Sequence, residues 1–409
     1  MGAWRAALIG LALLAPATAW AQAEPFSPQS LSGYLDLRAA AADGDSSWLD
    51  GGLGKTRFGP GATLSVGEAA LAWRPTLAWD WSAVVEGEIQ PDHESSPRLG
   101  EAYLRFKPFP VDGLRYGARA GLFYPPVSEE HGGVFWTPTQ TITPSAINSW
   151  IGEEVKVAGL ELYASQALGD QTLGLTAGVF GADETAGALL SLRGWSLDDV
   201  EAGADSNFRL PPLGAFLQRR QSAFTTPVRE LDGRAGYYGR LDWTVSPRLS
   251  LNAFLYDLPG DPTARDRLQW SWDTRFADLG ARADLDADWS LLSQLMVGEA
   301  KMGPQADDPW VQDDFAAAYV MAVRRFGDDA VSGRFDLFQT RDWADLIYGR
   351  TSEHGWALTA DLRHPLTAHA TGLLELLHVE SDRPGPTPAQ ALSPYERQTL
   401  AQAGLRLSF

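Results

Sequence analysis

The chain has 409 residues, and its 33 lysines and arginines against 52 aspartates and glutamates give a net charge of -19. This acidity excludes nucleic acid as a partner, because binding it requires a basic surface. The chain has no cysteine, so disulfides and thiolate metal sites are excluded as well. We assign no cofactor and no metal ligand from the sequence, and expect acidic surface loops, with or without divalent cations.

The N-terminus, residues 1–23, has the features of a secretory signal peptide. Arg5 precedes an apolar run at 6–15, and small residues offer cleavage sites after Ala21 or Ala23. The alternative is a buried N-terminal helix. No later stretch reaches the roughly 18 continuous apolar residues that a membrane helix needs. If residues 24–409 span a membrane, they must therefore do so as one closed β-barrel.

Alternation of apolar and polar residues predicts sixteen β-strands, although fourteen or eighteen would fit nearly as well. In chain order the strands are 31–39, 63–74, 77–89, 98–107, 114–123, 153–166, 172–181, 237–245, 249–257, 272–285, 289–301, 315–325, 330–340, 355–363, 370–380 and 397–409. Short turns alternate with longer segments at 40–60, 90–97, 124–152, 182–236, 258–271, 302–314, 341–354 and 381–396. This asymmetry is typical of outer-membrane barrels, and a soluble all-β protein is the alternative.

Residues 124–152 form an unusual loop after the fifth strand. Its prolines at 125, 126, 138 and 144 prevent it from extending the hairpin. It also carries apolar side chains that an exposed loop would not bury, namely Phe135, Trp136, Ile147, Trp150 and Ile151. We therefore expect this loop to fold into the barrel and narrow it. The longer segment 182–236 could cover the mouth, form a second constriction, or pack on the rim or on a partner.

Residues opposite the apolar set of each strand should face the inside of the barrel. One cluster comprises Tyr103, Arg105, Arg115 and Arg119 on two adjacent strands. Further candidates for lining the lumen are Arg240, Asp242, Arg334, Asp336, Asp361, Arg363 and Arg406. A barrel of sixteen strands is wide enough for an aqueous channel, and charged residues along it tune which ions pass. The alternative is that these charges form salt-bridge ladders that only solvate the lumen.

The last strand has apolar residues at alternate positions up to Leu407, and polar residues such as Gln402 and Arg406 between them. It ends at Phe409, and so resembles the C-terminal signature that assembly machinery reads in Gram-negative outer-membrane barrels. That resemblance implies export to the outer membrane, contact with its lipid, and recognition by the barrel-assembly machinery. We expect this strand to pair with 31–39 and close the barrel.

The whole layout resembles the sixteen-stranded bacterial porins, whose third external loop folds inward to form a constriction. Within 121–154, the segment 123–131 (FYPPVSEEH) also resembles the phosphate-selective and related porin-like groups, although the acidity of this chain departs from their basic ladder. The resemblance implies that Glu129 and Glu130 face Arg105, Arg115 and Arg119 across the pore; a solvated loop tip is the alternative. The short second loop, 90–97, leaves a homotrimer open.

The function that these features predict is passive diffusion of ions and small hydrophilic solutes through a water-filled channel. A substrate-specific channel for anions or oligosaccharides, a barrel adhesin and an outer-membrane hydrolase are the alternatives. We expect no enzyme, because the six histidines are scattered and no nucleophile elbow occurs. Ser128 and His131 are the serine–histidine pair that we considered for catalysis, and in a proline-rich loop their closeness is more simply fortuitous. Ion selectivity stays open, since the global charge favours cations and the local arginines favour anions.

Overall fold

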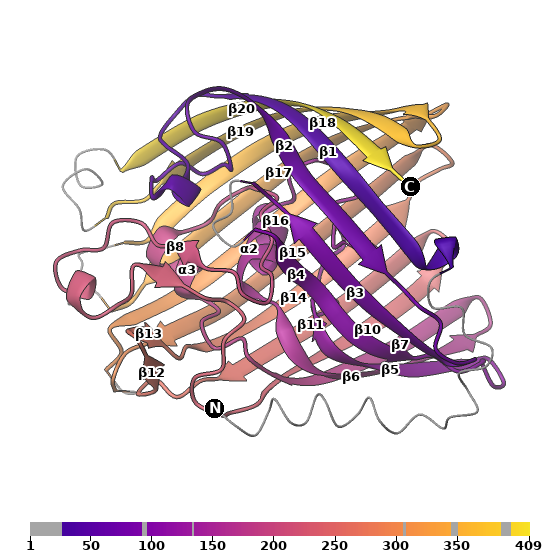
Figure 1. Cartoon of the computed structure of the whole chain (residues 1–409), viewed down its shortest axis with the longest axis horizontal. Coiled ribbons are helices and arrows are strands. Elements are labelled where there is room, and N and C mark those ends of the chain that lie inside the picture. The colour runs from indigo at the N-terminus through magenta and orange to yellow at the C-terminus, as the bar shows by residue number, and fades with distance from the viewer. Residues whose placement is uncertain (1–26, 92–95, 133–134, 306–307, 345–350, 386–393) are drawn as a thin grey trace.

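A computed structural model describes residues 27–91, 96–132, 135–305, 308–344, 351–385 and 394–409. The expected signal peptide lies outside the described residues. Sixteen strands form one closed antiparallel barrel, in which strands that follow one another along the chain are neighbours (Figure 1). They are β1 (Leu31–Ala42), β2 (Gly61–Trp73), β3 (Trp81–Ile89), β4 (Arg98–Phe106), β5 (Leu114–Phe123), β6 (Val157–Leu168), β7 (Gln171–Gly181), β10 (Gly236–Ser246), β11 (Leu249–Pro259), β14 (Asp273–Asp284), β15 (Trp289–Met302), β16 (Val311–Phe326), β17 (Asp329–Asp342), β18 (Glu353–Thr367), β19 (Ala370–Asp382) and β20 (Tyr395–Ser408).

The predicted fold class and strand number are therefore confirmed. Two further pairs of short strands lie in the loops, β8 (Phe208–Arg209) with β9 (Phe224–Thr225) and β12 (Arg265–Asp266) with β13 (Gln269–Trp270). Among the described residues, no helix is long and apolar enough to cross a membrane.

The barrel closes between its first and last strands, as predicted. β1 and β20 are paired from Tyr34 with Ser408 to Ala42 with Leu400. Gly33 and Phe409 extend the pairing, because each N–H donates to the carbonyl of the other at 3.2 and 3.1 Å. A Cβ on Gly33 would lie 2.7 Å from the carbonyl oxygen of Ala70 on β2 and 2.8 Å from the Phe409 ring at the seam, so close packing requires glycine here. Closure leaves no open strand edge to face lipid.

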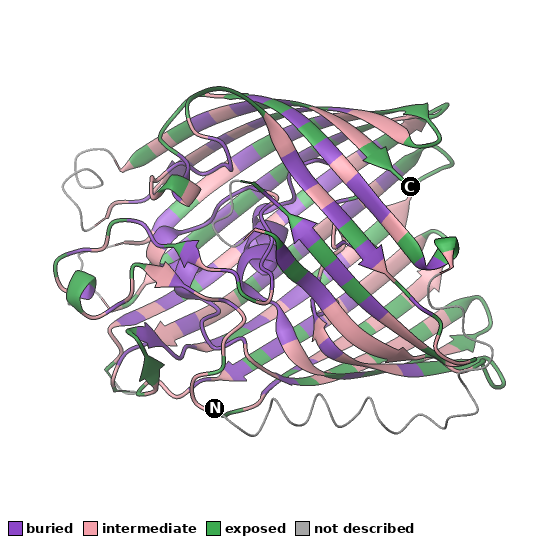
Figure 2. Ribbon diagram, in the orientation of Figure 1, coloured by how far each residue is buried: buried purple, intermediate pink, exposed green. Residues whose placement is uncertain are grey.

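Burial alternates along the strands, which separates an inner from an outer face (Figure 2). On β17, Arg334 and Asp336 are buried, whereas Phe335 between them and Leu337 after them are exposed. Because side chains of a strand alternate in direction, the buried set points into the barrel and the exposed set points outward. Exposed leucines on the outer face include Leu255, Leu279, Leu295, Leu358 and Leu374. Such a face suits lipid.

Exposed aromatic residues gather at the end of the barrel that carries the short turns. Trp79, Phe109, Trp289 and Phe409 all lie in or next to these turns or at the C-terminus, and all are exposed. Aromatic girdles at the membrane interface are a general feature of outer-membrane barrels.

One predicted strand begins in the wrong place. The sequence predicts a strand over 153–166, but Ala146–Glu154 forms helix α2 and β6 begins only at Val157. Ser145 caps the helix, because its Oγ accepts from the N–H of Asn148 at 3.3 Å. All nine residues of α2 are buried. The apolar residues of this segment are thus buried by a helix inside the ring of strands.

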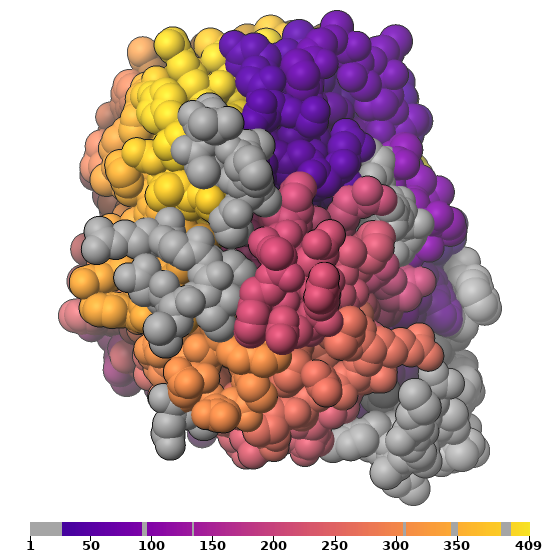
Figure 3. All heavy atoms as spheres, turned by 90° about the vertical axis from the view of Figure 1, so that its left-hand side faces the viewer, coloured from indigo at the N-terminus to yellow at the C-terminus, as the bar shows by residue number. Residues whose placement is uncertain are grey.

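Two chain segments meet in this interior: the inner loop (residues 124–156), which contains α2, and the long loop (residues 182–235), which contains helix α3 (Ala188–Arg193). The Trp150 ring of α2 lies 5.1 Å from Phe315, 5.4 Å from Phe276 and 6.2 Å from Trp195 of the long loop. Figure 3 shows the long loop over the centre of the loop-bearing end. The long loop thus covers the mouth, which is one of the alternatives for it, and it also packs inside the barrel, which the sequence did not predict.

Candidate functional site

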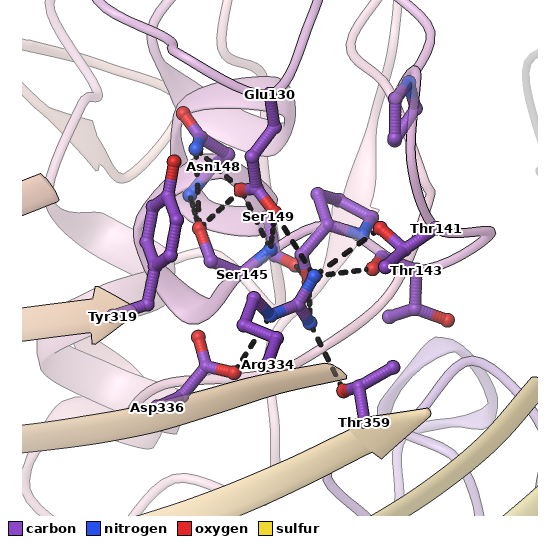
Figure 4. Close-up of polar contacts among 12 residues, drawn as sticks. Glu130, Thr141, Thr143, Ser145, Asn148, Ser149, Tyr319, Arg334, Asp336 and Thr359 are labelled. Carbon is purple, nitrogen blue, oxygen red and sulfur yellow. Dashed lines mark hydrogen bonds and ion pairs between the residues drawn. The ribbon is translucent and has the colours of Figure 1, made fainter. Parts of the chain in front are cut away.

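Arg334 of β17 joins the inner loop to the barrel wall (Figure 4). Its Nη1 donates to Glu130 at 2.9 Å and to the carbonyl of Thr143 at 2.8 Å, and its Nη2 donates to the carbonyl of Pro144 at 2.8 Å. Its Nε donates to Asp336 of the same strand at 2.8 Å. With further bonds to Thr141 Oγ1 at 3.3 Å and to Thr359 Oγ1 of β18 at 3.2 Å, one guanidinium binds four residues of the inner loop and two of the wall, so that it fixes the loop as a planar, multivalent donor.

Glu130 is the loop residue at the centre of this network. It accepts from the Ser145 N–H at 2.9 Å and from Asn148 Nδ2 at 2.6 Å, besides Arg334. Its side chain is only 1% exposed. The alternative of a solvated loop tip is therefore wrong for Glu130. A carboxylate that is so enclosed stabilises the loop rather than meeting solutes directly.

Glu129 occupies a more open position. It accepts from Arg240 at 2.9 Å and from Asn252 at 2.6 Å, and Arg240 also pairs with Asp242 at 2.8 Å. The Glu129 and Arg240 side chains keep 13% and 12% of their surface exposed. Arg240 further donates to the Pro126 carbonyl at 2.5 Å. An acid from the inner loop and a base from the wall thus meet at a place that water reaches.

The prediction that Glu129 and Glu130 face Arg105, Arg115 and Arg119 is wrong. Arg119 pairs with Glu161 of β6 at 2.8 Å and lies over the Phe123 ring at 4.0 Å. Arg105 is opposite Arg119 in the register of β4 and β5, whereas Arg115 is exposed. The difference arises because the loop extends to the barrel walls at β10 and β17. In addition, Glu161 on the adjacent strand already neutralises Arg119. Tyr103 lies beside Arg119, with its ring 5.7 Å from the guanidinium.

The other predicted lining residues form ion pairs along the inner wall. Arg334 with Asp336, and Arg240 with Asp242, pair at i and i+2 on one strand. Asp361 and Arg363 do so at 3.6 Å, and Arg406 of β20 pairs with Asp36 of β1 at 2.9 Å. These contacts agree with the alternative of inward salt-bridge ladders. Several of the same basic groups also bind the inner loop, as Arg363 does through the Thr141 carbonyl at 2.5 Å.

Several neutral or acidic wall residues with a similar anchoring role were missed from the sequence, and three of them illustrate it. Gln294 of β15 donates to the Val127 carbonyl at 3.0 Å. Glu375 of β19 accepts from the N–H groups of Ile142 and Thr143 at 2.7 and 2.9 Å. Gln402 of β20 donates to Thr143 Oγ1 at 3.1 Å. Their inward position in the alternation would have identified them, had amide and carboxylate side chains been considered as partners for the loop.

The wall formed by β2, β3 and β4 is acidic. Glu68, Glu86, Glu88 and Glu101 are all at most 5% exposed, and Glu201 of the long loop joins them. Arg98 pairs with Glu88 at 3.1 Å, and Lys156 donates to the Gly100 carbonyl at 2.9 Å. Burial and the nearby Glu88 and Glu68 raise the pKa of Glu201 well above its usual range. Carboxyl groups therefore outnumber basic groups at this wall.

Ser128 and His131, the pair considered for catalysis, are hydrogen-bonded at 2.8 Å. The Ser128 oxygen also accepts from the N–H groups of Glu130 and His131, each at 3.1 Å, as a serine does when it closes a turn. The His131 ring stacks on Trp136 with centroids 3.7 Å apart. Burial and the charge of Arg334 lower the pKa of His131 well below its usual range. The geometry therefore describes a turn with a stacked neutral imidazole.

Comparisons with known proteins give matches in structure but not in sequence. No protein-family model matches the chain, and no curated protein matches it. The outer membrane channel DcaP of Acinetobacter baumannii is similar, with a TM-score of 0.56 at 10% identity over 93% of this chain and 96% of that chain. A loop-deletion mutant of OmpT, an outer membrane protein of Vibrio cholerae, gives 0.51 at 9% identity over 93% and 99%. The trimer form of OmpT gives 0.50 at 9% identity, again over 93% and 99%. At such identities the likeness shows a shared barrel fold.

Proposed function

We propose that this chain is a porin, a passive channel for ions and small hydrophilic solutes in the outer membrane of a Gram-negative bacterium. The observation that carries the proposal is a closed sixteen-stranded barrel with a charged inner wall. A barrel of this size encloses an aqueous lumen unless something fills it. The similarity in fold to DcaP, which is described as an outer membrane channel, supports the same function.

The inner loop would set the size limit of this channel. It is bound to β10, β15, β17, β18, β19 and β20 through the contacts described above, and α2 packs against the long loop. With two segments inside the barrel, the passage is narrower than the ring of strands. We place the constriction beside Glu129 and Arg240, whose partly exposed charges lie between the loop and the wall.

The charge distribution favours a preference for cations. Arg119, Arg240 and Arg334 are each paired with a carboxylate, so none of them is free to hold an anion, and Asp242 beside Arg240 is an acid with 44% of its side chain exposed. Phosphate selectivity would instead require basic groups that are free to receive an anion. Arg105 and Arg115 would then contribute less to selectivity than Glu129, because Arg105 borders the paired Arg119 and Arg115 lies near the short-turn end.

Partners follow from the same proposal. The outer face would contact lipid, and the β20 strand ending at Phe409 would be read by the barrel-assembly machinery. A homotrimer is consistent with the trimer form of OmpT, and sedimentation of the purified protein in detergent would measure the oligomeric state.

Swelling of proteoliposomes tests the proposed function. Vesicles that contain the refolded protein should swell rapidly in small sugars and progressively more slowly as the sugar grows, because the inner loop limits passage by size. Protein-free vesicles give the baseline. Swelling no faster than this baseline for the smallest sugar would contradict the proposal.

A further inference from the structure

Three carboxylates meet at the base of the long loop, outside the interior described above. Glu184 follows the end of β7, and Glu230 and Asp232 precede the start of β10. Each offers a carboxylate oxygen, and these oxygens all lie within 4.8 Å of one another. The group thus joins the two ends of one loop of the chain.

The main chain holds all three carboxylates in place. Oε2 of Glu184 accepts from the N–H groups of Leu231 and Asp232, the latter at 2.7 Å. The Glu230 oxygens accept from Gly233 at 2.6 Å and Ala182 at 3.1 Å, and Asp232 Oδ1 accepts from Arg234 at 2.7 Å. The carboxylates are therefore oriented before any ligand arrives, which lowers the cost of binding one.

A second observation indicates that something is needed between them. Oε1 of Glu184 accepts no hydrogen bond from an N–H or hydroxyl group of the described residues, the carboxylates of Glu230 and Asp232 are its polar neighbours, and Glu184 is 0% exposed. A buried carboxylate oxygen without a partner is costly. Two neighbouring arginines are engaged elsewhere, because Arg234 pairs with Asp261 at 3.2 Å and Arg229 pairs with Asp266.

The electrostatics agree with this geometry. Burial and the adjacent Glu230 and Asp232 raise the pKa of Glu184 to about 9. Three carboxylates at such distances repel one another unless a proton or a cation lies among them. A cation has access, since Glu230 is exposed and Asp232 is partly exposed.

We propose that Glu184, Glu230 and Asp232 bind one divalent cation, Ca²⁺, from the medium outside the cell. The donors are all carboxylate oxygens, which hard cations prefer, and Ca²⁺ accepts irregular oxygen geometry completed by water. Mg²⁺ demands a near-ideal octahedron and is the weaker competitor. The amino-acid composition alone indicated no metal ligands, whereas this site provides three. The proposal does not depend on the channel function.

Such a cation would hold the two ends of the long loop together at its base. The loop carries Trp195, which packs against Trp150 of α2, and the Glu184 carbonyl accepts from the Trp272 N–H at 2.8 Å. A ligand that binds only the ordered loop stabilises it by mass action. Removing Ca²⁺ should therefore expose residues 182–235 to protease while leaving the strands protected.

Binding is measured on the refolded full chain after chelator treatment. Tb³⁺, used as the luminescent probe, should bind beside Trp272 and be displaced by Ca²⁺ at a single saturable site. Glu230→Gln and Asp232→Asn should each weaken Ca²⁺ binding by roughly tenfold or more, since even an outer-shell partner is worth that much. Asp170→Asn, an exposed residue of the turn between β6 and β7, makes the same charge change away from the site and should bind as the wild type does.

Limited proteolysis provides the second readout. Ca²⁺ should slow cleavage within 182–235 several-fold in the wild type and in Asp170→Asn, but not in Glu230→Gln. No saturable binding, unchanged affinity in both site variants, or equal loss in Asp170→Asn would each overturn the proposal. So would loop protection that follows pH but ignores Ca²⁺, because the carboxylates would then hold a proton.

Discussion

Glu130 and Arg334 are 204 residues apart in sequence, yet their side chains form an ion pair of 2.9 Å inside the barrel. Neither side chain is more than 1% exposed. The pair connects the loop that follows β5 to β17, which is not a neighbour of β5 in the barrel. It therefore fixes the loop against a distant wall, and several measurable consequences follow from that position.

Loss of Arg334 should be strongly destabilising. Arg334→Met leaves Glu130 and Asp336 as buried charges without their partner, which costs about 3–5 kcal/mol. Urea unfolding in detergent micelles would measure the difference, and the double variant with Glu130→Gln should recover part of it. Arg275→Met is the matched control, because Arg275 is 50% exposed in its pair with Glu299 and should cost about 1 kcal/mol or less. Equal losses in Arg334→Met and Arg275→Met would contradict the assigned role.

Glu129 and Arg240 should shift ion selectivity in opposite directions. Glu129→Gln removes a negative charge from the constriction and should lower the preference for cations, whereas Arg240→Gln should raise it. Reversal potentials across a bilayer in a salt gradient provide the measurement. Asp170→Asn changes the charge equally at the periphery and should leave the potential unchanged. If neither Glu129→Gln nor Arg240→Gln moves it, the constriction lies elsewhere.

Trp150 should keep the passage narrow as well as the protein stable. Trp150→Ala opens a cavity among Phe276, Phe315 and Trp195, and such truncations cost about 3–5 kcal/mol. The loosened α2 should also increase conductance and its fluctuation. Trp79→Ala removes an 80% exposed ring at the other end and should leave conductance as it was. A stable Trp150→Ala variant with unaltered conductance would argue against α2 as a restriction.

The strand-count prediction succeeded because period-two alternation and proline or glycine turns are local signals. On β17, for example, Arg334, Asp336 and Phe338 are buried whereas the lipid-facing Leu337 is exposed. Alternate positions in the sequence thus directly predict which side chains point into the barrel. The start of β6 was missed because Glu153 and Glu154 also suit a strand edge, whereas the cap at Ser145 decides for a helix.

The partners of Glu129 and Glu130 could not be predicted from the sequence. Their choice of Arg240 and Arg334 depends on where a loop of the chain crosses the barrel, which is a tertiary property. The alternation of residues along the strand correctly placed Arg334 on the inner wall, but it carried no information on which loop would contact it. The metal-ligand candidates were missed for the same reason, since Glu184 and Glu230 are brought together only when the long loop closes.

Phe409 should matter for assembly more than for the finished barrel. Its backbone pairs with Gly33 at the seam, while its side chain is 71% exposed. Phe409→Ala should lower the amount of protein inserted into outer membranes in cells, yet leave refolding in detergent nearly unchanged. Phe109→Ala, also exposed at the short-turn end, is the control and should insert normally. Equal insertion of the two variants would contradict recognition through Phe409.

Single-channel recording in a planar lipid bilayer tests the channel claim most directly. The refolded wild type should give stepwise conductance in symmetrical salt, and Trp150→Ala should give larger and noisier steps than the wild type. The absence of any step in the wild type, at every voltage and salt concentration and with insertion verified independently, would contradict the proposed function.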